Sequence, residues 1–194
     1  MKKIVVEHLE PELSKWVLIE YRHAYKIAGE SLLITGIKIE GLPSTERRFY
    51  EIFDPSRVII LDPQAKERLR KEDLQWADAI VIGGILGDHP PRGRTKEYLS
   101  DKFPQAIKRN IGDKQFSIDG AVYIAYQMLI NDKGLEEIPY TFGILITTNY
   151  RGVTNEIYLP YAYPLVNGRP LISEELIRYL IKGNSYELRW GVEI

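Results

Sequence analysis

Three short candidate strands, each followed by an unusual loop, most constrain how this chain of 194 residues can fold. They are residues 58–61, 79–82 and 106–111. The first two are unbroken apolar runs, which are typical of parallel strands that are buried on both faces. Asp62-Pro63 ends the first candidate strand, Gly83-Gly84 the second and Gly112 the third. The sequence therefore predicts a mainly parallel sheet with three special loops at its carboxyl edge.

Helical patterns lie between the strand patterns, so the predicted fold class is α/β with a parallel sheet flanked by helices. Apolar residues recur at helical spacing over residues 11–28, before Gly29, and over residues 118–131, after Ser117. Shorter strands are expected at 3–6 and 31–37. Residues 41–56 are polar and are predicted to form a loop or a short helical connection.

The C-terminal part has a different pattern, which predicts a small strand and helix extension. Residues 138–166 are rich in tyrosine and β-branched residues, which favours strands or a hairpin, and residues 173–181 favour a short helix. The tyrosines at 158, 161 and 163 could form a hairpin core or a recognition surface. We divide the chain into a core, 1–135, and an extension, 136–194, packed together as one structural domain.

Composition argues against several classes of function, although it leaves room for a local basic patch. The net charge is -1, whereas broad nucleic-acid binding usually needs a strongly basic domain. There is no cysteine, and the three histidines are scattered at 8, 23 and 89, so we expect neither a disulfide nor a metal site. No run of apolar residues resembles a signal peptide or a membrane span, so we expect a cytoplasmic protein with no membrane partner.

The three loops, residues 61–63, 83–92 and 110–117, are the candidate ligand site. Ligands of open α/β sheets bind beyond the carboxyl ends of the strands, and glycine allows the backbone to approach a ligand closely. Each loop taken alone could be only a turn, but the three together favour a pocket made largely of backbone. Dinucleotide and P-loop signatures are both absent, so the spacing alone names no ligand.

The second loop carries a resemblance to a known family. Residues 83–96, GGILGDHPPRGRTK, resemble the signature of a subfamily of SPOUT methyltransferases. Its members include a protein arginine methyltransferase that acts on a small-subunit ribosomal protein. The segments that support the resemblance are 7–10, 16–21, 61–63 and 111–115. Gly93, a shorter segment between 36 and 57 and a divergent tail depart from the family pattern.

The resemblance implies a C-terminal trefoil knot in the core and a methyl donor, S-adenosyl-L-methionine, bent into that knot without a metal. S-adenosyl-L-homocysteine would be the product. The three loops would hold the donor. The donor-site residues that the resemblance implies are Leu61, Asp62, Pro63, Gly83, Gly84, Ile85, Gly87, Asp88, Ile111, Gly112, Asp113, Gln115, Phe116 and Ser117.

An arginine acceptor would need acidic side chains, because a guanidinium stays protonated at neutral pH. The catalytic candidates are Glu7, Asp88 and Glu156, with His89 as a general base. Each has an alternative. Glu7 could cap the helix that starts near Pro11, and Asp88 could bond the amides of its own loop. Glu156 could be a solvated strand residue, and His89 a structural hydrogen-bonding group.

Arg92 and Arg94 are the substrate-binding candidates, because they could contact the donor carboxylate or an RNA phosphate; they could also be simply solvated. Three functions remain open at this point. The favoured one is arginine methylation of a ribosomal protein, the second is methylation of tRNA or rRNA, and the third is donor binding without catalysis. We expect a monomer, because residues 136–194 could fold back over the face through which many SPOUT enzymes pair.

Overall fold

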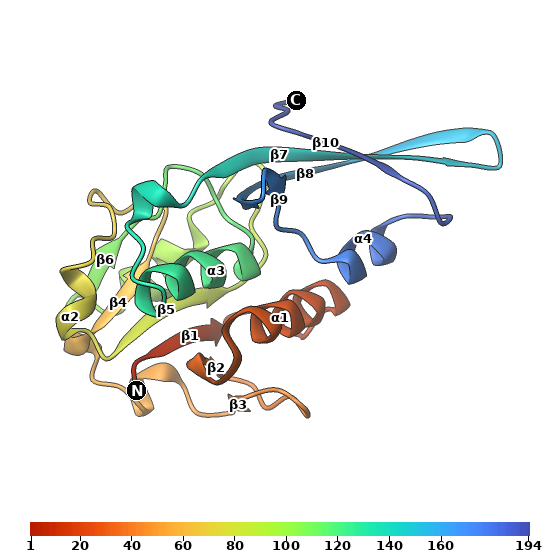
Figure 1. Cartoon of the computed structure of the whole chain (residues 1–194). Helices are drawn as coiled ribbons and strands as arrows, with labels where there is room; N and C mark the ends of the chain where they lie inside the picture. The colour runs from red at the N-terminus through yellow and green to blue at the C-terminus, as the bar shows by residue number, and fades with distance from the viewer.

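The computed structural model describes residues 1–194, and a parallel sheet lies at its centre (Figure 1). Its six strands follow the order β3-β2-β1-β5-β4-β6, and every neighbouring pair is parallel. They are β1 (Lys3–His8), β2 (Leu32–Thr35), β3 (Ser44–Thr45), β4 (Val58–Leu61), β5 (Ala79–Gly84) and β6 (Ile107–Arg109). The predicted α/β class and parallel sheet are confirmed.

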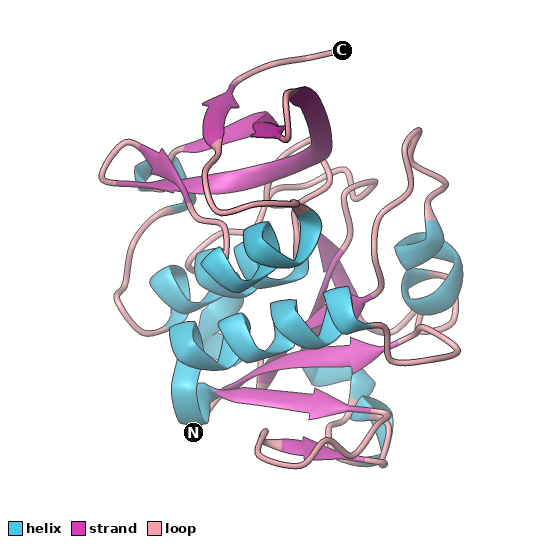
Figure 2. Ribbon diagram, turned by 90° about the vertical axis from the view of Figure 1, so that its right-hand side faces the viewer, coloured by secondary structure: helices cyan, strands magenta, loops and turns pink.

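Each face of the sheet has its own core, because side chains alternate along a strand. Ile4 and Val6 of β1 face the helices α1 (Lys15–Ala28) and α3 (Ile118–Leu129), which lie side by side over the sheet (Figure 2). Val5 faces the opposite way, into a smaller cluster with Phe49 and Leu99. The helical turns η2 (Phe49–Glu51) and η4 (Lys96–Ser100) contribute these two residues.

Helix α1 begins later than the apolar pattern predicted. The side chain of Ser14 accepts a hydrogen bond of 3.2 Å from the amide of Val17, so the first helical residue is Lys15 and not Pro11. The predicted C-terminal end is confirmed, because Gly29 adopts a positive φ of 54° directly after Ala28. Glu7 does not cap this helix, since Ser14 does.

The strand boundaries differ from the prediction in several places. Strand β1 extends to His8, two residues beyond its predicted end. Gly83 and Gly84 belong to β5 and pair with Glu7 and His8, so the second loop starts after the glycines and not at them. Strands β2 and β6 are shorter than predicted. Residues 41–56, predicted to form a loop or a short helical connection, contain the helical turn η2 and also β3, which adds two residues to the edge of the sheet.

The C-terminal part forms a second, antiparallel sheet of order β10-β7-β8-β9. Its elements are β7 (Tyr140–Tyr150), β8 (Val153–Val166), β9 (Arg169–Pro170), the helix α4 (Glu174–Leu180) and β10 (Glu187–Trp190). The predicted hairpin is β7–β8, whose outer end projects beyond the core (Figure 1). Arg151 and Gly152 both have positive φ, which matches the right-handed twist of a tight hairpin. Strand β10 and the short helix α2 (Asp73–Trp76) were not predicted.

Backbone hydrogen bonds hold the third loop against the chain that follows β4 and against the hairpin. After β6, Asn110 pairs with the loop that follows β4: its amide donates to the carbonyl of Glu67, and its carbonyl accepts from Leu69, both at 2.9 Å. The chain then reaches Gln115, whose carbonyl accepts a 2.8 Å bond from Ala162 of β8. The first loop, the third loop and the hairpin are therefore held in one arrangement at the carboxyl edge of the sheet.

Candidate functional site

A pocket of about 510 Å³ lies at the carboxyl ends of β4 and β5, and all three predicted loops line it. We call it the loop pocket. The predicted residues that line it are Leu61, Asp62, Pro63, Gly83, Ile85, Ile111, Gly112, Gln115, Phe116 and Ser117. Five further lining residues were not predicted: Ile82, Thr95, Lys114, Ile118 and Ala121. Helical spacing could have revealed Ile118 and Ala121, because they lie on one face of the first turn of α3.

The lining of the loop pocket is about half apolar, and its polar part includes Lys114 and the side-chain amide of Gln115. The Oε1 atom of Gln115 is buried and has no hydrogen-bond partner in the protein. A buried acceptor without a partner is costly, so this atom is suited to receive an N–H or O–H group of a ligand. Asp62 is engaged instead, because its carboxylate accepts from the Ser100 hydroxyl at 2.6 Å and from the Gln64 amide at 2.9 Å. Asp62 thus fixes the shape of the first loop.

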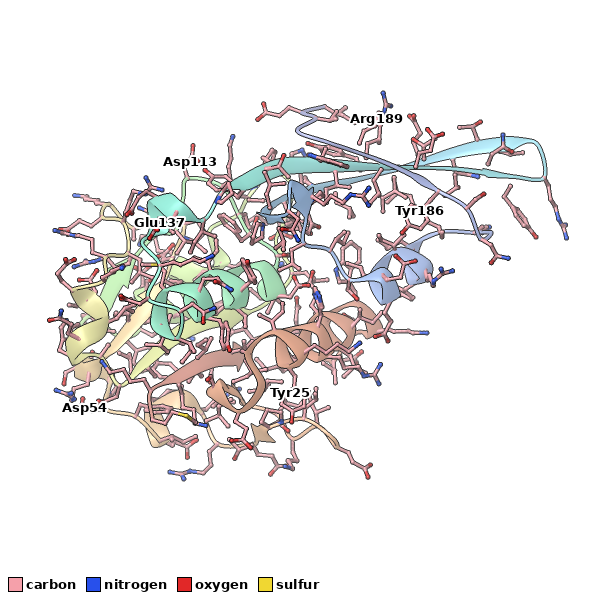
Figure 3. The ribbon with its side chains drawn as sticks, in the orientation of Figure 1. Tyr25, Asp54, Asp113, Glu137, Tyr186 and Arg189 are labelled. Carbon is pink, nitrogen blue, oxygen red and sulfur yellow. The ribbon has the colours of Figure 1, made fainter.

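A second, charged pocket of about 580 Å³ adjoins the loop pocket and shares Asp62, Pro63, Ile85, Thr95 and Gln115 with it. Its other lining residues are Gln64, Leu86, Asp88, Pro91, Arg92, Gly93, Arg94 and Asp113. Asp88 pairs with Arg94, whose Nε lies 2.8 Å from the carboxylate, and not with the amides of its own loop. Asp113 points outward from the third loop (Figure 3).

Glu7 lies elsewhere. Its side chain is buried in β1, where it accepts hydrogen bonds from the Arg48 guanidinium at 3.1 Å, from the Phe49 amide at 3.0 Å and from the Thr35 hydroxyl. It lines a separate groove that shares no residue with the two pockets described above. The structure does not bring Glu7 together with Asp88, and the contacts of Glu7 fix the turn η2 against β1.

The two glycines expected to matter most for a backbone pocket have different surroundings. Gly84 lies outside both pockets, and an added Cβ would lie 2.8 Å from the carbonyl of Glu7 and against the Tyr21 hydroxyl. Gly84 therefore allows β5, β1 and α1 to pack closely. An added Cβ at Gly87 would instead meet the side-chain amide of Gln115, a residue that lines both pockets.

Neither Glu156 nor His89 lines the two pockets. Glu156 is exposed on β8 beside Arg189, 3.8 Å away, and six residues of extended strand, about 20 Å, separate it from Ala162 at the third loop. The structure thus supports the solvated interpretation of Glu156. His89 is exposed in the second loop, with its ring 6.4 Å from that of Tyr158.

Tyr161 supports the second loop, a role that the sequence did not assign to it. Its hydroxyl donates a 2.9 Å hydrogen bond to the carbonyl of Gly87 in the second loop. Burial, together with nearby Glu20 and Asp88, raises the pKa of Tyr161 to about 12, so the hydroxyl keeps its proton. The cluster of tyrosines was the available signal, but the partner of each tyrosine depends on how the hairpin meets the core.

A buried acidic cluster supports the floor of the loop pocket. Glu20 of α1 accepts hydrogen bonds from the Ile118 amide at 3.1 Å and the Trp16 indole at 3.2 Å. Burial and the neighbouring Asp119 raise the pKa of Glu20 well above its usual range. Asp119 in turn lies 2.6 Å from Nδ1 of His23. These contacts hold the first turn of α3 against α1, and so position Ile118 and Ala121.

The arrangement contains no group of three or more histidine, aspartate or glutamate side chains placed to hold a metal ion. None of the helices is both long and apolar enough to cross a membrane.

Comparison with known proteins agrees with this geometry. The family model for SFM1-like protein arginine N-methyltransferases matches residues 3–187. The chain is 32% identical to protein arginine N-methyltransferase SFM1 of Saccharomyces cerevisiae, over 96% of this chain and 97% of the relative. The crystal structure of the yeast enzyme with SAH superposes with a TM-score of 0.77 and 30% identity, over 91% of this chain and 93% of the other.

A more distant likeness concerns the fold alone. The crystal structure of a dual specific Trm10 from Thermococcus kodakaraensis gives a TM-score of 0.57 at 17% identity, over 71% of this chain and 96% of the other. It supports the predicted SPOUT fold. Since the family match extends over nearly the whole sequence and includes all three loops, the chain belongs to the SFM1-like family of protein arginine N-methyltransferases.

Proposed function

We propose that this protein transfers a methyl group from S-adenosyl-L-methionine to an arginine of a ribosomal protein, and that the loop pocket holds the donor. The observation that carries the proposal is the junction of the two pockets. A pocket that is about half apolar and has an unpaired acceptor adjoins a pocket that contains a partly exposed carboxylate, Asp88. A neutral, flat ligand group and a cationic acceptor can therefore be held next to each other.

The residues of the loop pocket fit the adenosyl part of this donor. Ile82, Phe116 and Ala121 offer apolar surface to a flat ring, and the free Oε1 of Gln115 can accept from an amino group. Crystal structures of yeast SFM1 with SAM and with SAH support the same ligand here. When bound, the donor supplies an electrophilic methyl group, and the protein contributes orientation and electrostatics.

The acceptor arginine enters as a cation beside a cationic sulfonium, so a carboxylate must offset the repulsion. Three carboxylates line the charged pocket. Asp62 is buried and hydrogen-bonded by Ser100 and Gln64, and Asp113 is exposed on the third loop. Asp88 is the one that is both partly buried and free of backbone bonds. We assign Asp88 to hold the guanidinium and orient one of its nitrogens.

A labelling experiment tests both the acceptor and the donor. The protein is incubated with ribosomal subunits and donor labelled in the methyl group, with a chelator present, and RNA is then separated from protein. The proposal expects label in one ribosomal protein, recovered as methylarginine after hydrolysis. Asp88→Asn serves as the control that should reduce the label. Label in tRNA or rRNA would replace the arginine proposal with RNA methylation.

We also propose that the protein acts as a monomer in the cytoplasm, where a ribosomal acceptor is available. The packing of the extension supports this: Ile177 of α4 and Tyr161 of β8 lie in one apolar cluster with Trp16 of α1. This cluster covers part of α1 that a partner subunit would otherwise need. Light scattering over a wide concentration range should give the mass of one chain, and a stable dimer would contradict the proposal.

A further inference from the structure

The ion pair between Asp88 and Arg94 lies inside the charged pocket, where the acceptor is proposed to bind. The two side chains have nearly equal exposure, 27% for Asp88 and 26% for Arg94. Both line the pocket, and Nε of Arg94 lies 2.8 Å from the Asp88 carboxylate. The remaining polar contact of this guanidinium is with the carbonyl of Leu86, in the same loop.

The chemistry of this pair matches that of the expected substrate. Arg94 presents a guanidinium to Asp88, and a substrate arginine would present the same planar cation to the same carboxylate. A substrate arginine held bidentately needs both carboxylate oxygens of Asp88, and Nε of Arg94 already lies against one of them. Substrate binding at Asp88 in this geometry therefore requires Arg94 to move.

On the basis of the proposed function, we propose that Arg94 is an internal mimic of the substrate. In the free enzyme its guanidinium occupies the Asp88 site, and the acceptor arginine displaces it. Arg94 then balances the negative charge of Asp88 when no substrate is bound. The acceptor gains access by exchanging one guanidinium for another. In this scheme Asp88 contacts the substrate, whereas Arg94 competes with it.

Two other arginine–carboxylate pairs, in which the carboxylate is buried, have additional donors that fix the carboxylate. Asp73 accepts from two nitrogens of Arg109, at 2.9 and 3.1 Å, and also from the backbone amide of Arg70. Glu7 accepts from the backbone amide of Phe49 as well as from Arg48. Asp88 has no backbone donor, so only the pairing with Arg94 holds its carboxylate. Such a pair is suited to exchange.

The test uses a small probe and does not depend on knowing the natural substrate. The probe is Nα-acetylarginine N-methylamide, titrated by NMR into the whole protein saturated with S-adenosylhomocysteine, at about 0.15 M salt. In the wild type, the Nε–H signal of Arg94 should shift in proportion to bound probe. This arm needs no variant, so it stands even if a substitution disturbs folding. The matching citrulline compound, which is neutral, should leave the signal unchanged.

Two variants separate competition from general electrostatics. Arg94→Gln should bind the probe roughly threefold to fivefold more tightly than the wild type, as expected when a competing, partly exposed ion pair is removed. Arg68→Gln removes an exposed cation from the loop that follows β4, outside both pockets, and should change the affinity less than about twofold. Calorimetry with S-adenosylhomocysteine checks that both variants keep their donor pocket.

Each outcome decides the question. Weaker probe binding by Arg94→Gln would show that Arg94 supports Asp88 instead of competing with the substrate, and an equal gain in both variants would show an effect of net charge alone. Either result, or an Arg94 signal that ignores bound probe, overturns the mimic. The proposed function is decided separately, by whether the wild type labels arginine in ribosomal protein.

Discussion

The hydroxyl of Tyr161 donates a hydrogen bond to the carbonyl of Gly87, and so joins the C-terminal hairpin to the loop that carries the family signature. Tyr161 is nearly buried and lies in the apolar cluster of the second sheet, with Trp16 and Ile177. Gly87 lies beside the Gln115 side chain. The hairpin therefore holds the second loop in place next to both pockets.

Tyr161→Phe should weaken donor binding more than it weakens the fold. The lost hydrogen bond is worth about 1 kcal/mol of unfolding free energy. Without this hydrogen bond the second loop is less ordered in the free protein. Donor binding must then order the loop, and this entropic cost should lower donor affinity severalfold. Denaturant unfolding and calorimetry with S-adenosylhomocysteine give the two numbers. Tyr158→Phe is the matched control on the same strand, since that hydroxyl bonds to Val192 and not to the loop. Equal affinity losses in both variants would contradict this role.

Gly84→Ala should mainly lower stability, whereas Gly87→Ala should mainly lower donor affinity. The added methyl group at Gly84 meets the backbone of β1, which cannot move without disturbing the sheet. We therefore expect the free energy of unfolding to fall by about 1–3 kcal/mol. At Gly87 the methyl group meets a flexible glutamine, so stability should change little while donor affinity falls. Melting temperatures and calorimetry distinguish the two. A Gly84 variant with native stability and poor donor binding would place that glycine in the donor site after all.

Strands and their loops could be predicted because the signal is local. Strand β4 matches its apolar run to the residue, since both of its faces are buried and no polar position interrupts the pattern. The three loops follow from strand direction, because parallel strands end at one edge. The start of α1 could not be placed as well. The apolar pattern continues back to Pro11, whereas the helix begins only after Ser14, whose side-chain hydroxyl forms the N-terminal cap.

The meeting of particular side chains could not be predicted, because it depends on contacts far apart in sequence. Glu7 and Asp88 both belong to strands or loops at the same edge, yet Glu7 faces the side of the sheet covered by η2. Strand ends indicate a shared edge but not which way each side chain points around it. Tyr161 and Gly87 are likewise brought together only by the docking of the hairpin, which leaves no periodic signal.

Glu7→Ala should destabilise the protein by at least about 2 kcal/mol, because it removes a buried carboxylate that satisfies three donors. Any loss of methylation should then follow the fraction unfolded and disappear at low temperature. Urea unfolding and methylation rates at two temperatures test this. Glu156→Ala removes an exposed carboxylate from the hairpin and should change the free energy of unfolding by less than about 0.5 kcal/mol. A stable Glu7 variant without activity would return Glu7 to the catalytic candidates.

His8 should make the protein less stable in mild acid. It is buried beside the Tyr21 hydroxyl, 2.7 Å from Nδ1, and burial lowers the pKa of His8. The unfolded chain then binds the proton more readily than the folded one. The stabilising contribution is present above the unfolded value of about 6.5 and is lost as the pH falls below it toward the folded pKa. His8→Gln should flatten the unfolding free energy between about pH 7 and 5. A slope unaltered by His8→Gln would refute the assignment.

Gln115→Leu should make the free protein slightly more stable and yet bind the donor less well. The Oε1 atom of Gln115 is buried without a partner in the protein, so replacing it with an apolar group removes a desolvation penalty. With donor bound, the same atom is expected to accept a hydrogen bond, and its loss should weaken binding by roughly tenfold. Thermal unfolding without ligand and calorimetry with S-adenosylmethionine measure the two effects. Gln64→Leu is the control, since Gln64 lines only the charged pocket. If Gln115→Leu lost stability while keeping its donor affinity, the amide would be a packing residue, and the donor would have to take its hydrogen bond from the backbone of the loops.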